Sequence, residues 1–411
     1  MFKNTNTQGW IVVFAGLGVN IVLGVLYAWG IISAALIDQL GWSVTATQIP
    51  YMLACLVFSL SMIPGGSLLD KYGPNLVLMI SAVFALIGFT MSGLFLNLTG
   101  LTIFFGLLFG LAIGMGYSAP IPTAVKWFSS HKRGLVSGIV VSGFGLAPIF
   151  MAPLTSYLIN SFGISKTFFI LGSGAFIIIA LLSRFIKNPS NRYIPDKTPA
   201  ASQEPSVFQE VNLSWKEVLK TKNFYRLWIM YFCGTFTGLL LIGQMAKIGQ
   251  EQAGITQPFY IIIIYALFNY LGRIGCGIIS DKIGRRAALF IMFATLFTTY
   301  IFFGKLTSPL PLFFGIAIAG FNFGGMLTIF PAANADFFGM KNFGVNYGLL
   351  MTAYGMSGLL GPLAGGIIRD STGSYSMIYI IAALLSFVGG AVCMVMAKEA
   401  GTLKPALFKK A

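Results

Sequence analysis

Long apolar segments alternate with short polar ones along most of the 411-residue chain. A helix that crosses a bilayer needs about 20 mostly apolar residues. Twelve segments meet this requirement, and they are too long and too uniformly apolar to be strands of a membrane barrel. The pattern therefore predicts an all-α integral membrane protein with twelve spanning helices. The predicted spans are residues 10–36, 45–68, 75–97, 100–125, 134–160, 164–186, 224–247, 257–280, 286–305, 309–333, 344–368 and 375–397.

One long polar segment, residues 187–222, separates the first six spans from the last six. Its several prolines predict a linker between two six-helix bundles, residues 1–186 and 223–411. Near its end, Ser214 is followed three residues later by Glu217. This is the capping-box pattern, and it predicts that a short surface helix begins there.

The two halves carry the same loop motif. Residues 66–73 (GSLLDKYG) follow the second span, and residues 277–286 (GIISDKIGRR) follow the eighth. Their aspartates are 281 − 70 = 211 residues apart. An aromatic pair at 127–128 follows the fourth span and another at 337–338 follows the tenth, at an offset of 337 − 127 = 210. Two matches at nearly the same offset predict a duplicated six-helix unit.

Composition excludes most other classes of protein. The chain is 56% hydrophobic and 9% charged, whereas soluble globular domains carry roughly 25% charged residues. All four cysteines lie within apolar segments, where they are expected to pack as small hydrophobic side chains rather than form disulfides or bind a metal. The single histidine, His131, lies in a loop. No catalytic constellation, cofactor site or metal site is predicted, so the chain is not expected to be an enzyme.

Lysine and arginine are distributed unequally between the two sides of the predicted bundle. The side with both termini and the linker carries 21 of the 26, and the opposite loops carry four, Lys166, Lys247, Lys305 and Arg369. By the positive-inside rule, both termini and the linker lie in the cytoplasm, as expected for a multi-pass protein of the cell inner membrane. Because the net charge of +15 is scattered over short loops, no nucleic-acid partner is expected.

The remaining basic residue, Arg273, lies inside the eighth span. It precedes Asp281 by eight residues, which is about 12 Å along a helix. A cation at that depth costs about 2.5–3.5 kcal/mol on insertion scales. No Asp or Glu lies in the central part of any predicted span, and a guanidinium can bind a carboxylate through two hydrogen bonds. We therefore expect Arg273 to bind an anionic substrate, the alternative being a structural arginine bonded to helix-end carbonyls.

Other polar side chains in the spans are further candidates for the substrate site. Asn269 precedes Arg273 by four residues and shares its helix face, where it could contact the substrate, orient the guanidinium or join two helices. Phenols combine a hydroxyl with an apolar ring, which suits a short acid with a small apolar tail. Ordinary packing is the alternative for all of them. The candidates are Tyr27, Tyr117, Tyr354, Asn20 and Asn322.

Twelve spans, a central loop and the duplicated loop motif resemble the major facilitator superfamily. The resemblance implies alternating access between two bundles and a role for Asp70, Asp281 and Arg285 in cytoplasmic gating. Narrower stretches are similar to the monocarboxylate transporters and the oxalate:formate antiporters. These stretches are 26–29 (LYAW), 116–120 (GYSAP), 126–128 (KWF), 132–134 (KRG), 269–273 (NYLGR), 330–336 (FPAANAD) and 346–348 (NYG).

The chain departs from these two families at two positions. Asn269 stands where the animal monocarboxylate transporters have an aspartate, and an amide cannot ionise, so a proton relay through this position is in doubt. Tyr354 stands where the oxalate:formate antiporters have a second buried cation, a lysine. With one cation, the site would leave one of the two negative charges of a dianion uncompensated. The missing second cation favours a monocarboxylate substrate.

The expected function is secondary transport of small monocarboxylates such as L-lactate or pyruvate, by a monomer that works by alternating access. Resemblance to lactate and pyruvate carriers favours symport with a proton. Anion exchange of the oxalate:formate type is the first alternative. Export of hydrophobic drugs and sensing of an organic acid without transport are the others.

Overall fold

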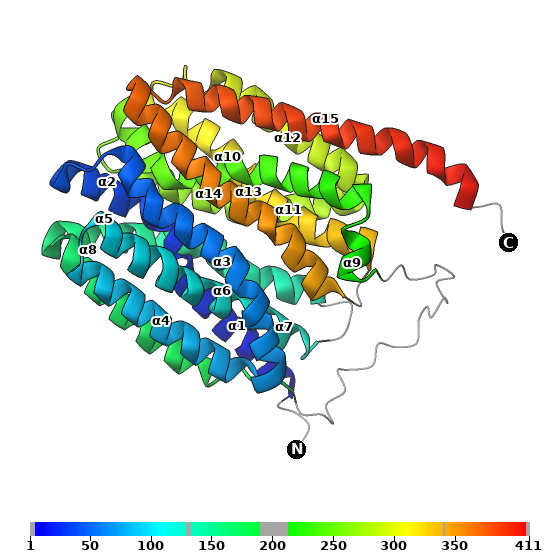
Figure 1. Cartoon of the computed structure of the whole chain (residues 1–411), viewed down its shortest axis with the longest axis horizontal. Coiled ribbons are helices and arrows are strands. Elements are labelled where there is room, and N and C mark those ends of the chain that lie inside the picture. The colour runs from blue at the N-terminus through cyan, green and yellow to red at the C-terminus, as the bar shows by residue number, and fades with distance from the viewer. Residues whose placement is uncertain (1–4, 129–132, 190–212, 340–341, 408–411) are drawn as a thin grey trace. The chain divides into compact units, whose positions relative to one another are not determined.

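In the computed structural model, residues 5–128, 133–189, 213–339 and 342–407 are described, and they form helices joined by short turns (Figure 1). No strand occurs among them. The expected all-α architecture is therefore confirmed. By their internal contacts the residues group into two compact units, Met1–Glu210 with Ile242–Ala246 and Val211–Leu241 with Lys247–Ala411. The predicted domain limits at the 187–222 linker stay a prediction.

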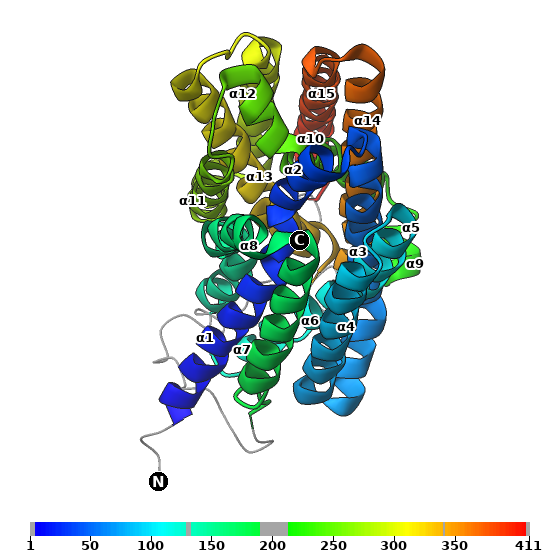
Figure 2. The ribbon, with the colours of Figure 1, turned by 90° about the vertical axis from the view of Figure 1, so that its left-hand side faces the viewer.

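The first unit contains the elements of the first six predicted spans. In Figure 2, α3, α4 and α6 run side by side, and α6 packs against both of the others. The elements are α1 Thr5–Leu23, the 3₁₀ segment η1 Gly24–Ala28, α2 Trp29–Leu40, α3 Val44–Tyr72, α4 Pro74–Leu94, α5 Leu98–Leu101, the π-helical segment η2 Thr102–Phe109, α6 Gly110–Ser118, α7 Pro120–Val125 and α8 Arg133–Ser183.

The second unit holds the other spans and the end of the linker. Its elements are α9 Trp215–Val218, α10 Lys222–Ala253 apart from Ile242–Ala246, α11 Phe259–Ile283, α12 Arg285–Phe303, α13 Pro309–Phe338, α14 Phe343–Thr372 and α15 Ser376–Leu407. Helix α9 begins at the predicted capping box, in which the Ser214 N–H donates to Glu217 Oε2 over 2.7 Å. Hydrogen bonds from the Ser214 side chain and backbone lower the pKa of Glu217.

Ten helical segments in the described part of the chain are long and apolar enough to cross a membrane. One of them, Val136–Ser183, contains two predicted spans, which meet at a sharp bend where Gly163 has φ 80° and ψ 168°. The eleventh predicted span coincides with the 30-residue helix α14, which is not among the ten because its glycines and polar side chains lower its mean hydropathy. The ten segments make the chain a multi-pass membrane protein.

The duplicated loop motif adopts the same backbone conformation in both units. Gly73 ends α3 with φ 81° and ψ 173°, and Gly284 ends α11 with φ 88° and ψ 149°. They are 284 − 73 = 211 residues apart, the offset of the aspartates. Because L-residues with a side chain are strained at such angles, the motif requires glycine at these two positions. This shared geometry supports an internal duplication.

Glycines also let helices touch backbone to backbone at equivalent places in the two units. In the first unit, a Cβ on Gly114 of α6 would overlap the Ser61 hydroxyl and the Phe58 carbonyl of α3. In the second unit, a Cβ on Gly324 of α13 would overlap the Asn269 carbonyl of α11. The second and fourth spans of each unit therefore form a tightly packed helix pair.

The turn at Gly73 offers a direct test of backbone strain. Gly73→Ala should lower the free energy of unfolding by about 1–3 kcal/mol, because φ 81° is unfavourable for alanine although no atom lies within 4 Å of the added Cβ. The measurement is thermal unfolding of the purified protein in detergent. Gly66→Ala is the control, since it also has open space around the Cβ but lies within α3. Equal unfolding temperatures for the two variants would contradict the prediction.

Candidate substrate-binding site

Arg273 is held in a fixed orientation inside α11. Its side chain is 7% exposed, and its Nε donates to Asn269 Oδ1 over 3.0 Å. One helical turn separates the two residues, so both lie on the same face. The bond fixes the plane of the guanidinium group. Of the roles expected for Asn269, orienting the guanidinium is the one for which the structure provides a contact.

Asn269 has a second polar atom available at the same place. Its side chain is 0% exposed, and its Nδ2 has no hydrogen-bond partner among the described residues. A buried amide donor without a partner costs about 1–3 kcal/mol. Such a group in a native fold calls for an explanation, and a bound ligand that accepts its hydrogen bond is one.

The tight contact between α11 and α13 sets the position of this pair. The Asn269 carbonyl lies against Gly324, and Gly272 lies against the Phe321 carbonyl, so neither glycine leaves room for a Cβ. Both contacts join α11 to α13 within one turn of the guanidinium-bearing residue. Movement of α13 would therefore move the backbone that carries Arg273.

Tyr354 is the candidate contributed by α14, and it is 1% exposed. The residues three positions before and after it both contact α10. The Tyr231 hydroxyl donates to Met351 Sδ over 3.3 Å, and the Thr235 hydroxyl donates to Ser357 Oγ over 2.8 Å. Since residues three apart share a helix face, Tyr354 lies on the side of α14 that packs towards α10.

The first unit brings two of the predicted tyrosines onto one aromatic cluster. The ring of Phe144 lies 4.8 Å from that of Tyr27 and 5.6 Å from that of Tyr117, edge to face in both cases. Phe58 completes the cluster, with its ring 5.4 Å from that of Tyr117. Tyr27 belongs to the 3₁₀ segment η1, where Gly24 packs against the Phe144 backbone. This interruption of the first span places the Tyr27 ring beside Phe144.

The two other candidate asparagines are not brought to these groups. Asn20 of α1 is fully buried, and its Nδ2 donates to the Val140 carbonyl of α8 over 2.8 Å. Asn322 of α13 donates to the Ile318 carbonyl over 2.8 Å and accepts from the Thr295 hydroxyl over 3.2 Å. Both amides thus bond to the protein's own helices, and Asn322 lines a separate cavity between α11, α12 and α13.

Comparison with known proteins identifies the family of this fold. The sequence profile of the Major Facilitator Superfamily matches residues 10–309 and 260–410, which together cover almost the whole chain. The chain belongs to the Major Facilitator Superfamily. Membership confirms the resemblance seen in the sequence and makes the protein a membrane transporter rather than an enzyme.

Relatives within the superfamily include carriers of small organic anions. The chain is 30% identical over 387 residues to the oxalate:formate antiporter of Oxalobacter formigenes, covering 92% of this chain and 89% of the relative. It is 24% identical over 341 residues to monocarboxylate transporter 2 of Homo sapiens, covering 76% and 69%. A bacterial homologue of the human lysosomal transporter Spinster shares the fold, with a TM-score of 0.71, 14% sequence identity and coverage of 97% and 98%.

The residues predicted to act in gating are described only in part. The side chains of Asp70 and Asp281, and all of His131, lie outside the described residues. Arg285 is described: its Nε lies 3.2 Å from Asp336 Oδ2, and its Nη1 donates to Ser280 Oγ over 2.6 Å. The ion pair joins the start of α12 to the end of α13.

Two sets of contacts at this end of the second unit were not anticipated from the sequence. Asp336, the partner of Arg285, belongs to the 330–336 stretch, which carried only a resemblance. Asn342 and Asn346 each donate to the Leu213 carbonyl over 3.0 Å, and the Leu213 N–H donates to the Phe338 carbonyl over 3.0 Å. The end of the linker is thereby fastened to the turn between α13 and α14.

Three of the four cations expected in the opposite loops lie within helices, Lys166 in α8, Lys247 in α10 and Arg369 in α14. Lys247 was expected in a loop, but α10 continues to Ala253 and places Lys247 half-buried inside the helix. The helix extends because Gln244, Lys247 and Glu251 follow helical spacing along one face. It ends at Gly254, whose φ of 60° suits a left-handed cap. Arg273 is therefore not the only cation within the described helices that cross the membrane.

Substitution of Gly324 tests whether the α11–α13 contact holds the site together. Gly324→Ala should lower the free energy of unfolding by about 1–3 kcal/mol, because the added methyl overlaps the Asn269 carbonyl. Gly277→Ala on α11 is the control, since its Cβ meets only Thr328 Cγ2 at 3.4 Å and alanine favours a helix. Thermal unfolding in detergent measures both. An equal effect of the two substitutions would argue against the close contact.

Proposed function

We propose that this protein is a secondary transporter of small monocarboxylates, with Arg273 and Asn269 as the carboxylate-binding pair. The observation that carries the proposal is a buried guanidinium whose plane is fixed by Asn269, beside a buried amide donor of the same residue. Similarity to an oxalate:formate antiporter and to monocarboxylate transporters supports a small organic acid as the substrate.

The chemistry of the pair suits a carboxylate. A guanidinium matches the two oxygens of a carboxylate in geometry, and it stays protonated at any physiological pH. Asn269 Nδ2 supplies a neutral donor on the same helix face. We assign the apolar tail of the acid to Tyr354, a buried phenol of the same unit, and keep Tyr27 and Tyr117 as candidates within the first unit. We assign Asn20 and Asn322 to helix packing rather than to substrate contact, because their amide nitrogens donate to backbone carbonyls.

Symport with a proton is the proposed coupling. Guanidinium and amide side chains do not act as proton carriers. The proton must then travel with the acid itself or through water rather than through this pair. Alternating access supplies the movement, and the Arg285–Asp336 ion pair is a proposed element of the cytoplasmic gate. We further propose that the protein works as a monomer in the inner membrane with both termini in the cytoplasm.

Anion exchange is the second candidate, because the 30% identity to the oxalate:formate antiporter extends over most of both chains. An exchanger needs no proton, since each half-cycle carries an anion. Exchange and symport therefore predict opposite results when the vesicle interior contains no anion.

Uptake of radiolabelled L-lactate into proteoliposomes separates the two mechanisms. With an inward proton gradient and no internal organic anion, we expect lactate to accumulate and a protonophore to abolish the accumulation. Vesicles that contain no protein control for diffusion of the neutral acid. Uptake only after internal loading with lactate or formate would contradict symport and favour exchange, and oxalate would then be tested as the counter-substrate.

Arg273→Lys tests the carboxylate-binding role. The substitution keeps the charge but replaces a planar fork by a single ammonium group, so uptake should fall by about tenfold or more. Arg184→Lys is the matched control on an exposed residue at the end of α8, and it should leave uptake unchanged. Both variants are first compared for thermal stability. Unchanged uptake by a stable Arg273→Lys protein would exclude a substrate contact by the guanidinium.

Tyr354→Lys tests why a monocarboxylate is preferred. The new cation would lie on the face of α14 next to α10, where it offers a second charge to a dianion. We expect oxalate to compete more strongly with labelled lactate than it does in the original protein. Tyr354→Phe is the control, because it removes the hydroxyl without adding charge. No gain in oxalate competition would show that the number of cations does not set the preference.

A further inference from the structure

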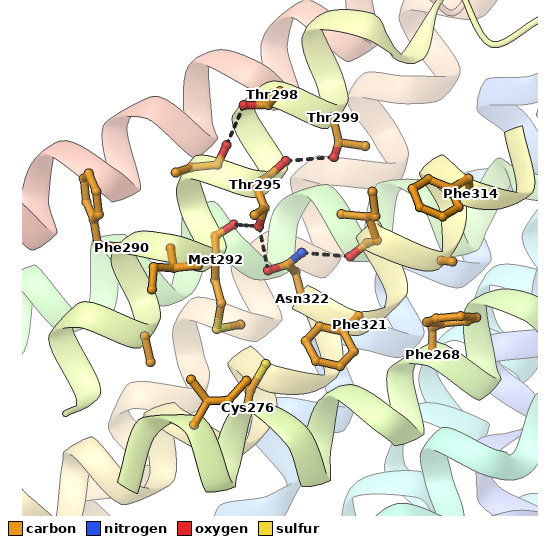
Figure 3. Close-up of a pocket in the computed structure, with 16 residues that line it drawn as sticks. Phe268, Cys276, Phe290, Met292, Thr295, Thr298, Thr299, Phe314, Phe321 and Asn322 are labelled. Atoms are coloured by element: carbon orange, nitrogen blue, oxygen red, sulfur yellow. Dashed lines mark hydrogen bonds between the residues drawn. The ribbon is translucent and has the colours of Figure 1, made fainter. Parts of the chain in front are cut away.

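A cavity of about 690 Å³ lies in the second unit between α12 and the α11–α13 pair (Figure 3). This volume is within the range of about 300–1,000 Å³ that is typical of small-molecule sites. The cavity is separate from the Arg273–Asn269 pair, since its α11 wall is formed by Phe268, Cys276 and Ile279. The proposed carboxylate chemistry does not use it.

The cavity opens towards the hydrocarbon part of the membrane. Its rim includes Phe290 and Ile291 of α12 and Phe314 of α13, which are 41%, 51% and 71% exposed. All three lie on helices long and apolar enough to cross the bilayer. Exposed aromatic and aliphatic side chains at such positions contact lipid chains rather than water. The medium at the mouth of the cavity is therefore hydrocarbon.

The polar groups that line the cavity bond to the protein itself. Thr298 and Thr299 donate to the carbonyls of Ala294 and Thr295, over 3.0 and 2.8 Å. Figure 3 shows Thr295 between the Met292 carbonyl and the side chain of Asn322, at 2.9 and 3.2 Å. The hydroxyl protons of Thr298 and Thr299 thus point to the helix backbone, and the single proton of Thr295 is shared between the Met292 carbonyl and Asn322 Oδ1. A cavity with such a lining has little attraction for water and suits an apolar occupant.

We propose that this cavity binds one acyl chain of a membrane lipid. An empty space of this size would deprive its walls of dispersion contacts, and a chain that enters from the adjoining bilayer restores them. A water-filled site is disfavoured by the bonded hydroxyls, and a charged ligand by the apolar walls. The chain lies between α12 on one side and the α11–α13 pair on the other.

This position links the lipid to the substrate site through α11. Phe268 immediately precedes Asn269, and Cys276 follows Arg273 by three residues. Phe321, whose carbonyl touches Gly272, lines the cavity from α13. The acyl chain therefore contacts the same helix pair whose close packing positions the guanidinium, and its occupancy supports that packing from the lipid side.

Photo-cross-linking of the full-length protein tests the site. The probe is phosphatidylcholine with a diazirine on one acyl chain, reconstituted with the protein, and adducts are located by peptide mass spectrometry. We expect labelling of the cavity walls to exceed that of the lipid-facing surface of α15 around Leu384. Ala317→Phe should fill the space and reduce the cavity labelling by about tenfold.

Controls separate loss of the site from loss of the fold. Leu384→Phe adds bulk to the lipid-facing surface of α15 and should leave the cavity labelling unchanged. Thermal unfolding checks each variant, and Thr298→Phe, on the open side of the cavity, replaces Ala317→Phe if the latter is unstable. Labelling equal to that around Leu384, or unchanged labelling in a stable cavity-filling variant, would overturn the proposal.

Cys276 reports independently on the medium inside the cavity. With Cys55, Cys233 and Cys393 replaced by alanine, Cys276 should react with an apolar maleimide but not with a charged, membrane-impermeant thiol reagent. Cys276→Ser in the same background measures nonspecific reaction. Rapid modification of Cys276 by the charged reagent would show a water-filled cavity and would also overturn the proposal.

Discussion

The backbone contact between α11 and α13 is the constraint on which the second unit depends. Gly272 and Gly324 bring each helix against a carbonyl of the other, so the spacing of the pair cannot shrink and can grow only by losing contact. The fixed spacing between α11 and α13 also fixes the position of the side chains that these helices carry. The proposed role of Arg273 depends on this constraint, because a guanidinium binds two carboxylate oxygens only when its plane is correctly directed. The bond to Asn269 then converts a fixed backbone into a fixed guanidinium.

The two units share a scaffold but differ in the chemistry they carry. The turns at Gly73 and Gly284 and the glycine-mediated helix pairs recur in both. In the first unit the polar candidates are phenols packed around Phe144, whereas the second carries a buried guanidinium. The two units thus share a backbone scaffold but differ in side chains. Phenols surround Phe144 in the first unit, and a guanidinium is buried in the second.

Local spacing explains what could be predicted from the sequence. The length and apolar character of the segments predicted the membrane helices, and the four-residue separation put Asn269 and Arg273 on one face. Contacts between distant segments were missed, such as Arg285 with Asp336, because no local pattern identifies a partner 51 residues away. Lys247 was assigned to a loop because polar residues surround it in the sequence. Two of them, Gln244 and Glu251, follow helical spacing with Lys247 along one face of α10. The cavity beside Asn322 depends on how far α12 stands from two other helices, which composition does not encode.

The proposed binding pair has consequences for the transport cycle. In the proposed cycle, the anion neutralises the guanidinium of Arg273 when it binds and leaves a buried cation when it is released. Return of the substrate-free protein is then the electrostatically costly step. A symporter must lower that cost by hydrating the guanidinium or offering it polar contacts on the way back, whereas an exchanger avoids the step by returning with a second anion. Asn269 is placed to lower it, because its Oδ1 accepts a hydrogen bond from Arg273 Nε. In the proposed mechanism, that bond would lower the cost of returning without substrate, which favours symport over obligatory exchange.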